Sequence, residues 1–228
     1  MQLFFDFPVQ PRYSFDNFIV CAGNRTACDF ARLLMAEGEI HNLLYVYGAA
    51  GCGKTHLLNA LGLGISGGES FPVVSCAGVG DRDPLRERVA EASFLLIDDI
   101  HLLPGDRRVE LWDIFNDFHR RGAKIAVTGE HPPRDLTNVD EHLTSRLMWG
   151  LVARIDVSDD SSRRLILRKL ADDRQLLLPE EVIEHLLRHC RRDIPSLLEA
   201  LERLRRASLA EKRKITLRLL REAMPELS

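Results

Sequence analysis

The stretch Gly48-Ala49-Ala50-Gly51-Cys52-Gly53-Lys54-Thr55 decides how this sequence is interpreted. It matches the pattern Gly-x-x-x-x-Gly-Lys-[Ser/Thr], in which glycines let backbone N–H groups turn inward around a phosphate. The apolar run 43–47 precedes it and predicts a buried strand, while residues 54–63 predict a helix whose positive end faces the loop. A strand before the motif and a helix after it are the context that a phosphate-binding loop requires, so we prefer this interpretation to an ordinary glycine-rich turn.

A second acidic element completes the prediction of a nucleotide site. Residues 94–97 form another buried apolar run and end at Asp98 and Asp99. In such sites the lysine, here Lys54, reaches the β- and γ-phosphates, and the hydroxyl of Thr55 ligates Mg²⁺. Asp98 then holds the metal through water, and Asp99 orients and activates the attacking water. The alternative is that the two aspartates merely end a strand in solvent. No Asn-Lys-x-Asp guanine-reading motif occurs, so we expect ATP or ADP with Mg²⁺.

The order of apolar and amphipathic segments predicts an α/β fold followed by helices. Strands are expected at 43–47, 71–76, 94–97, 124–128 and 154–157, and helices between them at 24–37, 54–63, 84–92 and 109–121. This alternation is typical of a parallel sheet flanked by helices. From residue 158 four helices are expected, with Ser158-Asp159-Asp160, Pro179, Asp193 and Thr216 at their starts. We therefore predict an extended tail at 1–12, an α/β nucleotide-binding domain at 13–157 and a small all-helical domain at 158–228.

Composition excludes several other classes of protein. The chain has 228 residues, 45% hydrophobic and 29% charged, with a net charge of −3, so its overall charge does not predict a nucleic-acid-binding protein. Its five cysteines are odd in number and form no Cys-x-x-Cys pair, which argues against a disulfide framework or a zinc site. No apolar run approaches the length of a membrane span, and the N-terminus lacks the features of a signal peptide. We expect a cytoplasmic protein without membrane contact.

Four blocks of sequence resemble the AAA+ ATPase core of DnaA, the bacterial replication initiator. They are Tyr13-Ser14-Phe15-Asp16-Asn17-Phe18-Ile19-Val20, residues 48–58, Leu96-Ile97-Asp98-Asp99-Ile100-His101-Leu102-Leu103, and Thr144-Ser145-Arg146-Leu147-Met148-Trp149-Gly150-Leu151. Their order and spacing match the family across residues 13–224. The resemblance implies an AAA+ P-loop fold in which residues 158–228 form the lid.

The resemblance also implies residue roles. Thr128 stands where the family keeps its sensor 1 residue, and Arg146 matches the arginine finger, which acts on the nucleotide of a neighbouring subunit; the alternative is an ordinary surface arginine. Asn24 follows residues 15–20, a segment that in the family lies near the adenine. The expected nucleotide-binding residues are Gly48, Ala49, Ala50, Gly51, Cys52, Gly53, Lys54, Thr55 and His56.

Three departures from DnaA define the expected subgroup. The resemblance covers neither an additional N-terminal domain nor the helix-turn-helix domain that reads origin DNA, so direct DNA contact is expected to be weak or indirect. Residues 58–94 are shorter than the region that grips single-stranded DNA in DnaA. Pro195 occupies the position of the sensor 2 arginine, so the chain's own ATP hydrolysis is expected to be weak if present. This layout resembles the Hda type, the regulatory inactivators of DnaA.

Hda-type proteins begin with a peptide that docks on the replicative sliding clamp. Gln2-Leu3-Phe4-Phe5-Asp6-Phe7 fits its form, with Gln2 as a hydrogen-bonding residue and Leu3, Phe5 and Phe7 as apolar anchors. The alternative is an aromatic tail packed on the core. The expected partners are DnaA and the clamp, with self-association through the nucleotide interface as a further expectation.

Other functions also fit the sequence. A non-catalytic adaptor would hold ADP as a structural ligand and bridge replication proteins, and Pro195 motivates this alternative. A helicase loader acting on single-stranded DNA is a third hypothesis. The arginines of the lid helices form either a solvated face or a surface for DNA or an acidic partner: Arg188, Arg191, Arg192, Arg203, Arg205 and Arg206.

Overall fold

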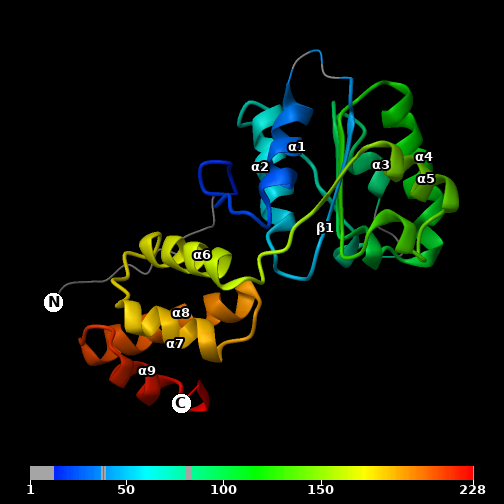
Figure 1. The fold of residues 1–228 in the computed structure, drawn as a ribbon. Coiled ribbons are helices and arrows are strands. Elements are labelled where there is room, and N and C mark those ends of the chain that lie inside the picture. Colours follow the sequence, from blue (N-terminus) through cyan, green and yellow to red (C-terminus); the bar gives the residue numbers. More distant parts are fainter. Residues whose placement is uncertain (1–12, 37, 39, 81–83, 228) are drawn as a thin grey trace.

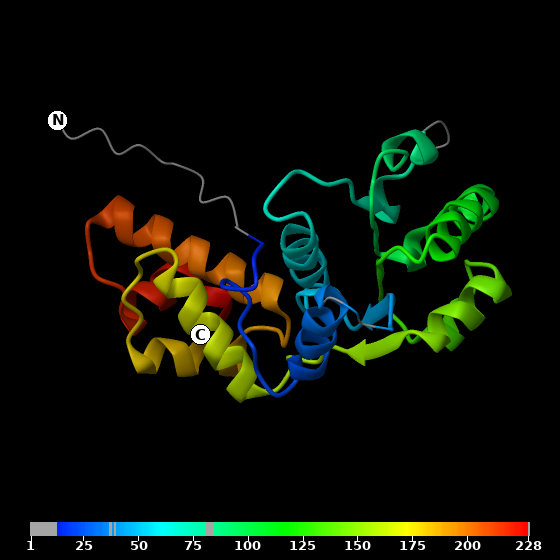
Figure 2. The ribbon, with the colours of Figure 1, turned by 90° about the horizontal axis from the view of Figure 1, so that it is seen from above.

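A computed structural model describes residues 13–36, 38, 40–80 and 84–227 of the chain. An α/β part is followed by a helical part, and Figures 1 and 2 show the two side by side. The expected α/β class with a C-terminal helical region is confirmed. Gln2, Leu3, Phe5 and Phe7 lie outside the described residues.

The sheet supplies the frame on which the candidate site is built. Within the described part of the chain, five parallel strands lie in the order β2-β3-β4-β1-β5. Val46 of β1 pairs with Thr128 of β4, and Ile97 of β3 pairs with Val127, so the carboxyl ends of three central strands lie together. The strands are β1 (Leu43–Tyr47), β2 (Val74–Ser75), β3 (Leu95–Asp98), β4 (Ile125–Gly129) and β5 (Leu151–Arg154).

Helices cover both faces of this sheet. One face packs against α1 (Arg25–Met35) and α2 (Lys54–Ile65), whose buried leucines and alanines join the inward side chains of β1 and β5. The other face packs against α3 (Leu85–Arg88), α4 (Arg108–Arg120) and α5 (Glu141–Trp149). Figure 1 shows α1 and α2 on one side of β1, with α3, α4 and α5 on the other. Burial on both faces explains why the central strands are continuous apolar runs.

The helical part has its own apolar core. It consists of α6 (Asp160–Asp172), α7 (Glu180–His189), α8 (Ile194–Glu211) and α9 (Leu217–Ala223). Leucines from all four helices meet in it and are fully buried. Side chains at the starts of three helices accept backbone N–H groups, as the sequence predicts: Asp159, Asp193 and Thr216. Short 3-10 turns complete the described elements: η1 (Cys76–Gly78), η2 (Ile100–Leu102), η3 (Gly105–Arg107), η4 (Pro133–Asp135) and η5 (Pro225–Leu227).

Three predicted elements were wrong in extent. The strand expected at 71–76 contains only Val74 and Ser75, because these two residues alone pair with β3 and the chain then turns into η1. The helix expected at 84–92 is a single turn, α3, that ends at Arg88. The strand expected at 154–157 begins three residues earlier, because the chain pairs with β1 immediately after Gly150.

Two simple structural facts bear on the class of protein. All five cysteines lie in the described part of the chain and are free thiols. Across that same part, we find no helix with the length and apolar character needed to cross a bilayer.

Candidate nucleotide site

The loop between β1 and α2 adopts the geometry that the glycine pattern predicts. Gly51 has a φ of 72°, a left-handed conformation that favours glycine. Space is also restricted, because a Cβ on Gly48 would lie 2.3 Å from the carbonyl oxygen of Ile155. Cys52 is buried within the loop, and burial raises the pKa of its thiol. The small side chain of Cys52 therefore fills space, and its thiol is protonated at neutral pH.

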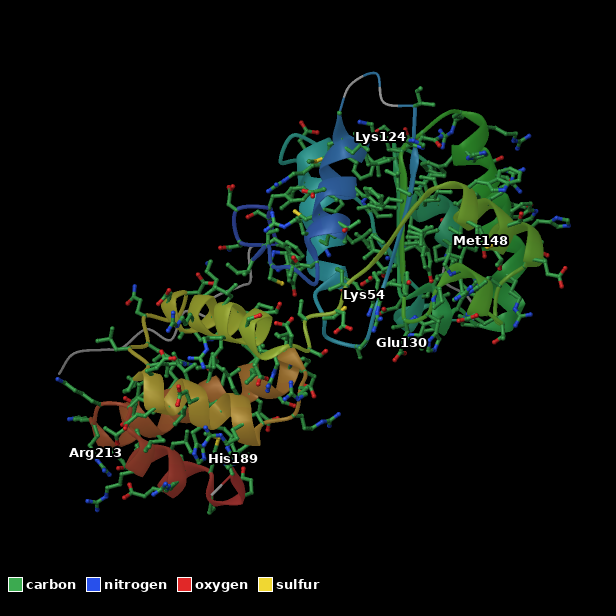
Figure 3. The ribbon with its side chains drawn as sticks, in the orientation of Figure 1. Lys54, Lys124, Glu130, Met148, His189 and Arg213 are labelled. Carbon is green, nitrogen blue, oxygen red and sulfur yellow. The ribbon has the colours of Figure 1, made fainter. Side chains whose placement is uncertain are left out.

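Lys54 places a buried positive charge against the backbone of this loop. Its side chain is buried, and its Nζ donates to the carbonyl oxygens of Gly48 at 2.9 Å and Ala49 at 3.1 Å. Among the described residues it forms no ion pair with a carboxylate. A buried ammonium held only by backbone carbonyls is poised to accept a stronger anionic partner. Figure 3 shows Lys54 at the side of the α/β part that faces the helical part.

Asp98 joins the phosphate loop to the central strands. The Thr55 hydroxyl donates to Asp98 Oδ2 at 2.8 Å, and the Thr128 hydroxyl donates to Asp98 Oδ1 at 2.5 Å. Thr128 is buried at the end of β4 and also accepts the backbone N–H of Asp99 at 2.9 Å. The structure thus brings together four residues that the sequence predicted for one site. A carboxylate and a hydroxyl at this spacing fit Mg²⁺, which takes few protein ligands and keeps water and phosphate oxygens.

Asp99 follows in a strained conformation. Its φ of 53° is left-handed, which is uncommon for a residue other than glycine although aspartate tolerates it better than most. Burial, and then the neighbouring carboxylate of Asp98, raise the pKa of Asp99. A raised pKa makes a carboxylate a better proton acceptor, which suits a residue that activates water.

His56 contacts the segment that precedes α1. Its Nε2 lies 3.2 Å from the carbonyl oxygen of Ser14, and its ring lies edge-on to those of Tyr13 and Phe18. Burial lowers the pKa of His56. Asn24 stabilises the same segment, since its side chain accepts the N–H of Cys21 and donates to the carbonyl of Ile19. These contacts hold residues 13–24 beside the start of α2.

The helical part reaches the phosphate loop through the first turn of α8. A Cβ on Gly51 would lie 2.4 Å from the ring of Pro195, so the proline lies directly against the loop. A small pocket of about 70 Å³ adjoins this contact. It is lined by Ala49, Ala50 and Cys52 from the loop, by Arg192, Asp193 and Ile194 at the start of α8, and by residues 154–158. Proline suits this first helical turn because its missing N–H has no partner there in any case.

Arg146 is separated from these residues. It lies on α5, whose buried Leu143 and Leu147 pack on the sheet face opposite to α2. Its guanidinium carbon lies 5.1 Å from the ring centroid of Trp112, and its Nη1 is buried without a hydrogen-bond partner in the described part of the chain. The structure therefore does not bring Arg146 into the chain's own phosphate site.

Two contacts near these residues were not predicted from the sequence. Trp112 carries no motif, and only the packing of α4 beside α5 brings it to Arg146. Lys169 of α6 donates to the side chain of Asn17 at 3.0 Å and so ties the helical part to the segment before α1. Because both contacts join residues far apart in the chain, local sequence pattern contains no signal for them.

The sheet, the phosphate loop and the helical lid define the AAA+ class of P-loop proteins. The chain belongs to the bacterial DnaA ATPase domain family, whose model matches residues 9–154. The model of the Hda lid domain matches residues 160–224. The DnaA-type core with an Hda-like layout, expected from the four sequence blocks, is therefore confirmed.

Individual relatives agree with this assignment. The chromosomal replication initiator protein DnaA of Geobacter sulfurreducens is 32% identical over 236 residues, covering 96% of this chain and 53% of that protein. The chain thus spans about half the length of the curated relatives it matches. Domain III of Thermotoga maritima DnaA has a TM-score of 0.82 at 27% identity, covering 97% of this chain and 99% of that one. AMPPCP-bound DnaA from Aquifex aeolicus has a TM-score of 0.75 at 27% identity, covering 87% and 67%.

Proposed function

We propose that this chain is a cytoplasmic, Hda-like regulator of replication initiation that binds ATP or ADP with Mg²⁺. Lys54 and the loop N–H groups bind the phosphates, while Thr55 and Asp98 hold the metal. Thr128 fixes the Asp98 carboxylate and Asp99 orients water. The buried, carbonyl-bound ammonium of Lys54 supports the phosphate site, and the Thr55–Asp98–Thr128 chain supports the metal site. The metal, when bound, would neutralise charge on the phosphate oxygens.

The proposed regulatory action belongs to Arg146. We place its guanidinium in the ATP site of a neighbouring DnaA subunit, where it stabilises charge as water attacks the γ-phosphorus and ADP leaves. The observation that carries this proposal is that Arg146 has no carboxylate partner among the described residues and lies on the sheet face away from the chain's own loop. Met148 and Trp149 beside it are exposed apolar side chains that suit a protein interface. Figure 3 shows Met148 on this far side, opposite Lys54.

The test measures hydrolysis of DnaA-bound ATP. Arg146→Ala should remove stimulation, a loss of about 10³–10⁵-fold if the finger behaves like others of its kind, while nucleotide binding by the chain itself is kept. Arg121→Ala is the matched control, because Arg121 also stacks on an aromatic ring of α4, at 4.2 Å from Phe118. Stimulation that survives Arg146→Ala, or is lost equally in both variants, would refute this role.

Clamp docking is a separate part of the proposal. The peptide Gln2-Leu3-Phe4-Phe5-Asp6-Phe7 supports it by sequence alone. Binding of the full chain to DNA-loaded clamp should be lost when Gln2, Leu3 and Phe7 are replaced by alanine, and binding to nucleotide should be unchanged. Unaltered clamp affinity in the triple variant would exclude this peptide as the anchor.

One observation favours an ADP-bound adaptor as the second candidate. Pro195 lies against Gly51, so the lid presents an uncharged ring to the loop at that point. An adaptor of this kind would bind ADP firmly and turn over little ATP. Steady ATP turnover by the purified chain, abolished by Asp99→Ala, would exclude the adaptor and assign hydrolysis to this site.

A further inference from the structure

Aromatic side chains gather near Arg146, and the nucleotide site does not explain them. Trp112 is half-buried on α4, and its ring lies under the Arg146 guanidinium at 5.1 Å. The same ring packs against His142 of α5, with centroids 6.0 Å apart, and stacks on Phe115 of its own helix. Trp112 is therefore held from two sides, and a cation above its face is stabilised by the ring quadrupole.

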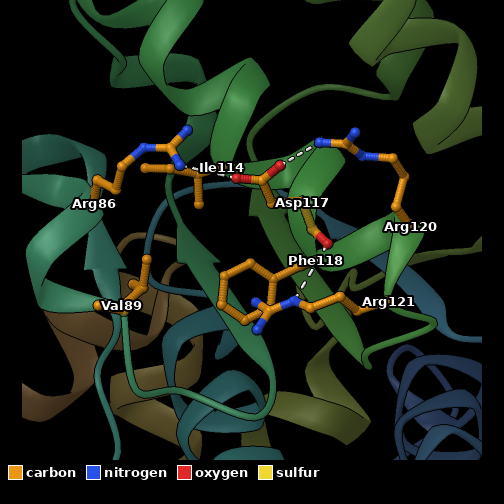
Figure 4. Close-up of a pocket in the computed structure, with 8 residues that line it drawn as sticks. Arg86, Val89, Ile114, Asp117, Phe118, Arg120 and Arg121 are labelled. Carbon is orange, nitrogen blue, oxygen red and sulfur yellow. Dashed lines mark hydrogen bonds and ion pairs between the residues drawn. The ribbon is translucent and has the colours of Figure 1, made fainter.

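The nearby carboxylates leave Arg146 without a counterion. Arg146 shares a groove with Arg86, Asp113, Asp117 and Arg120. Both oxygens of Asp117 are already bonded, Oδ2 to Arg86 at 2.9 Å and Oδ1 to Arg120 at 2.5 Å, as Figure 4 shows. Those bonds lower the pKa of Asp117, and its negative charge is already paired with two arginines. Within the described residues neither Asp117 nor Asp113 forms an ion pair with Arg146.

A ring and a carboxylate hold a guanidinium with different consequences. A carboxylate neutralises the charge and must be displaced before the guanidinium meets another anion. An aromatic face orients the guanidinium but leaves its charge and its N–H donors available. Burial and the nearby Arg146 lower the pKa of His119, so this imidazole adds no second positive charge at neutral pH. The arrangement holds the Arg146 guanidinium against an aromatic ring without neutralising its charge.

We infer that Trp112 is a positioning residue for the arginine finger: its ring holds the Arg146 guanidinium, unneutralised, in the orientation that a phosphate of a neighbouring subunit requires. This inference rests on the proposed function, since it assigns a residue that prepares Arg146 for that role. Trp112 does not itself touch nucleotide. Its contribution is the orientation of another side chain, which affects the rate of hydrolysis rather than the association of the two proteins.

The first experiment separates positioning from binding. The chain is titrated into DnaA loaded with ATP, in the presence of DNA-loaded clamp, and both the maximal hydrolysis rate and the half-saturating concentration are recorded. Trp112→Leu should lower the maximal rate by roughly tenfold, in keeping with the strength of a cation–π contact, and leave half-saturation unchanged. Trp112→Phe keeps an aromatic face and should retain most of the rate. In an Arg146→Ala background, Trp112→Leu should cause no further loss.

A second measurement needs no partner. The chain has two tryptophans, so Trp149→Phe leaves Trp112 as the single reporter. Its emission in the free protein should change on Arg146→Ala and much less on Arg121→Ala. Unchanged emission, an unchanged maximal rate in Trp112→Leu, or a shift in half-saturation alone would overturn the inference while leaving the proposed function intact. Absence of stimulation by the unsubstituted chain would overturn both.

Discussion

Arg163 shows how one buried side chain supports the lid. It is fully buried on α6, and its Nη atoms donate to the carbonyl oxygens of Leu187 at 2.8 Å, Arg191 at 3.0 Å and Cys190 at 3.3 Å. These carbonyls lie at and beyond the end of α7, where a helix leaves acceptors without intrahelical partners. A cation also interacts favourably with the negative end of the helix dipole. Arg163 therefore caps a helix other than its own.

The first prediction follows from this cap. Arg163→Met keeps the apolar volume but leaves buried carbonyls unpaired, so the free energy of unfolding should fall by about 3 kcal/mol. Urea denaturation followed by circular dichroism measures the change. Arg168→Met on the same helix is the control, because Arg168 forms an exposed ion pair with Glu180 and should cost less than about 1 kcal/mol. Equal losses in the two variants would contradict the capping role.

The start of α6 gives a prediction that depends on pH. Asp159 accepts the backbone N–H of Ser162 at 2.9 Å and the hydroxyl of Ser161. Hydrogen bonds from Ser161 and then Ser162 lower the pKa of Asp159 to about 2. Asp159→Ala should therefore reduce the free energy of unfolding by about 1 kcal/mol at neutral pH, as for other N-cap residues.

The sign of the pH effect follows from the lowered pKa. The folded pKa of Asp159 lies below the usual aspartate value of 3.8, so its stabilisation is complete above that value and is lost as the pH falls through about 2. The decrease in the free energy of unfolding caused by Asp159→Ala should become smaller over this pH range. Urea denaturation midpoints measured at each pH give the comparison. Asp159→Asn keeps an acceptor and should show a smaller and less pH-dependent loss. A cost for Asp159→Ala that stays constant down to pH 2 would contradict this account.

Elements differ in how far their sequence determines them. Strands β1, β3 and β4 lie within a residue of their apolar runs, because burial on both faces demands such runs. The edge strands β2 and β5 were misplaced, since their extent depends on which residues meet β3 and β1. Contacts between residues also differ in how far the sequence determines them. Asp98 was expected at the site because it ends a buried strand, and Thr128 because of the resemblance to DnaA, whereas the Trp112–Arg146 contact depends on packing between helices.

At the scale of the whole molecule, the lid and the phosphate loop are coupled by direct contact. Pro195 lies against Gly51, Ile194 packs against the core beneath α1 and α2, and Lys169 bonds to Asn17. A ligand that orders the loop would therefore also restrict the first turn of α8. Nothing in this coupling requires a charged residue at position 195, because van der Waals contact between a ring and a backbone transmits displacement well in a close-packed interior.

Hydrogen exchange can test this coupling. ATP with Mg²⁺ should slow the amide exchange of residues 197–199, in the first turns of α8, by more than that of α9, which packs on α7 and α8. Pro195→Ala keeps a residue suited to a helix but removes the ring from Gly51, so it should reduce the protection of α8 while α9 changes little. If ATP protects α8 and α9 equally, binding stabilises the lid as one unit. If Pro195→Ala leaves the protection intact, the contact with Gly51 does not carry the coupling.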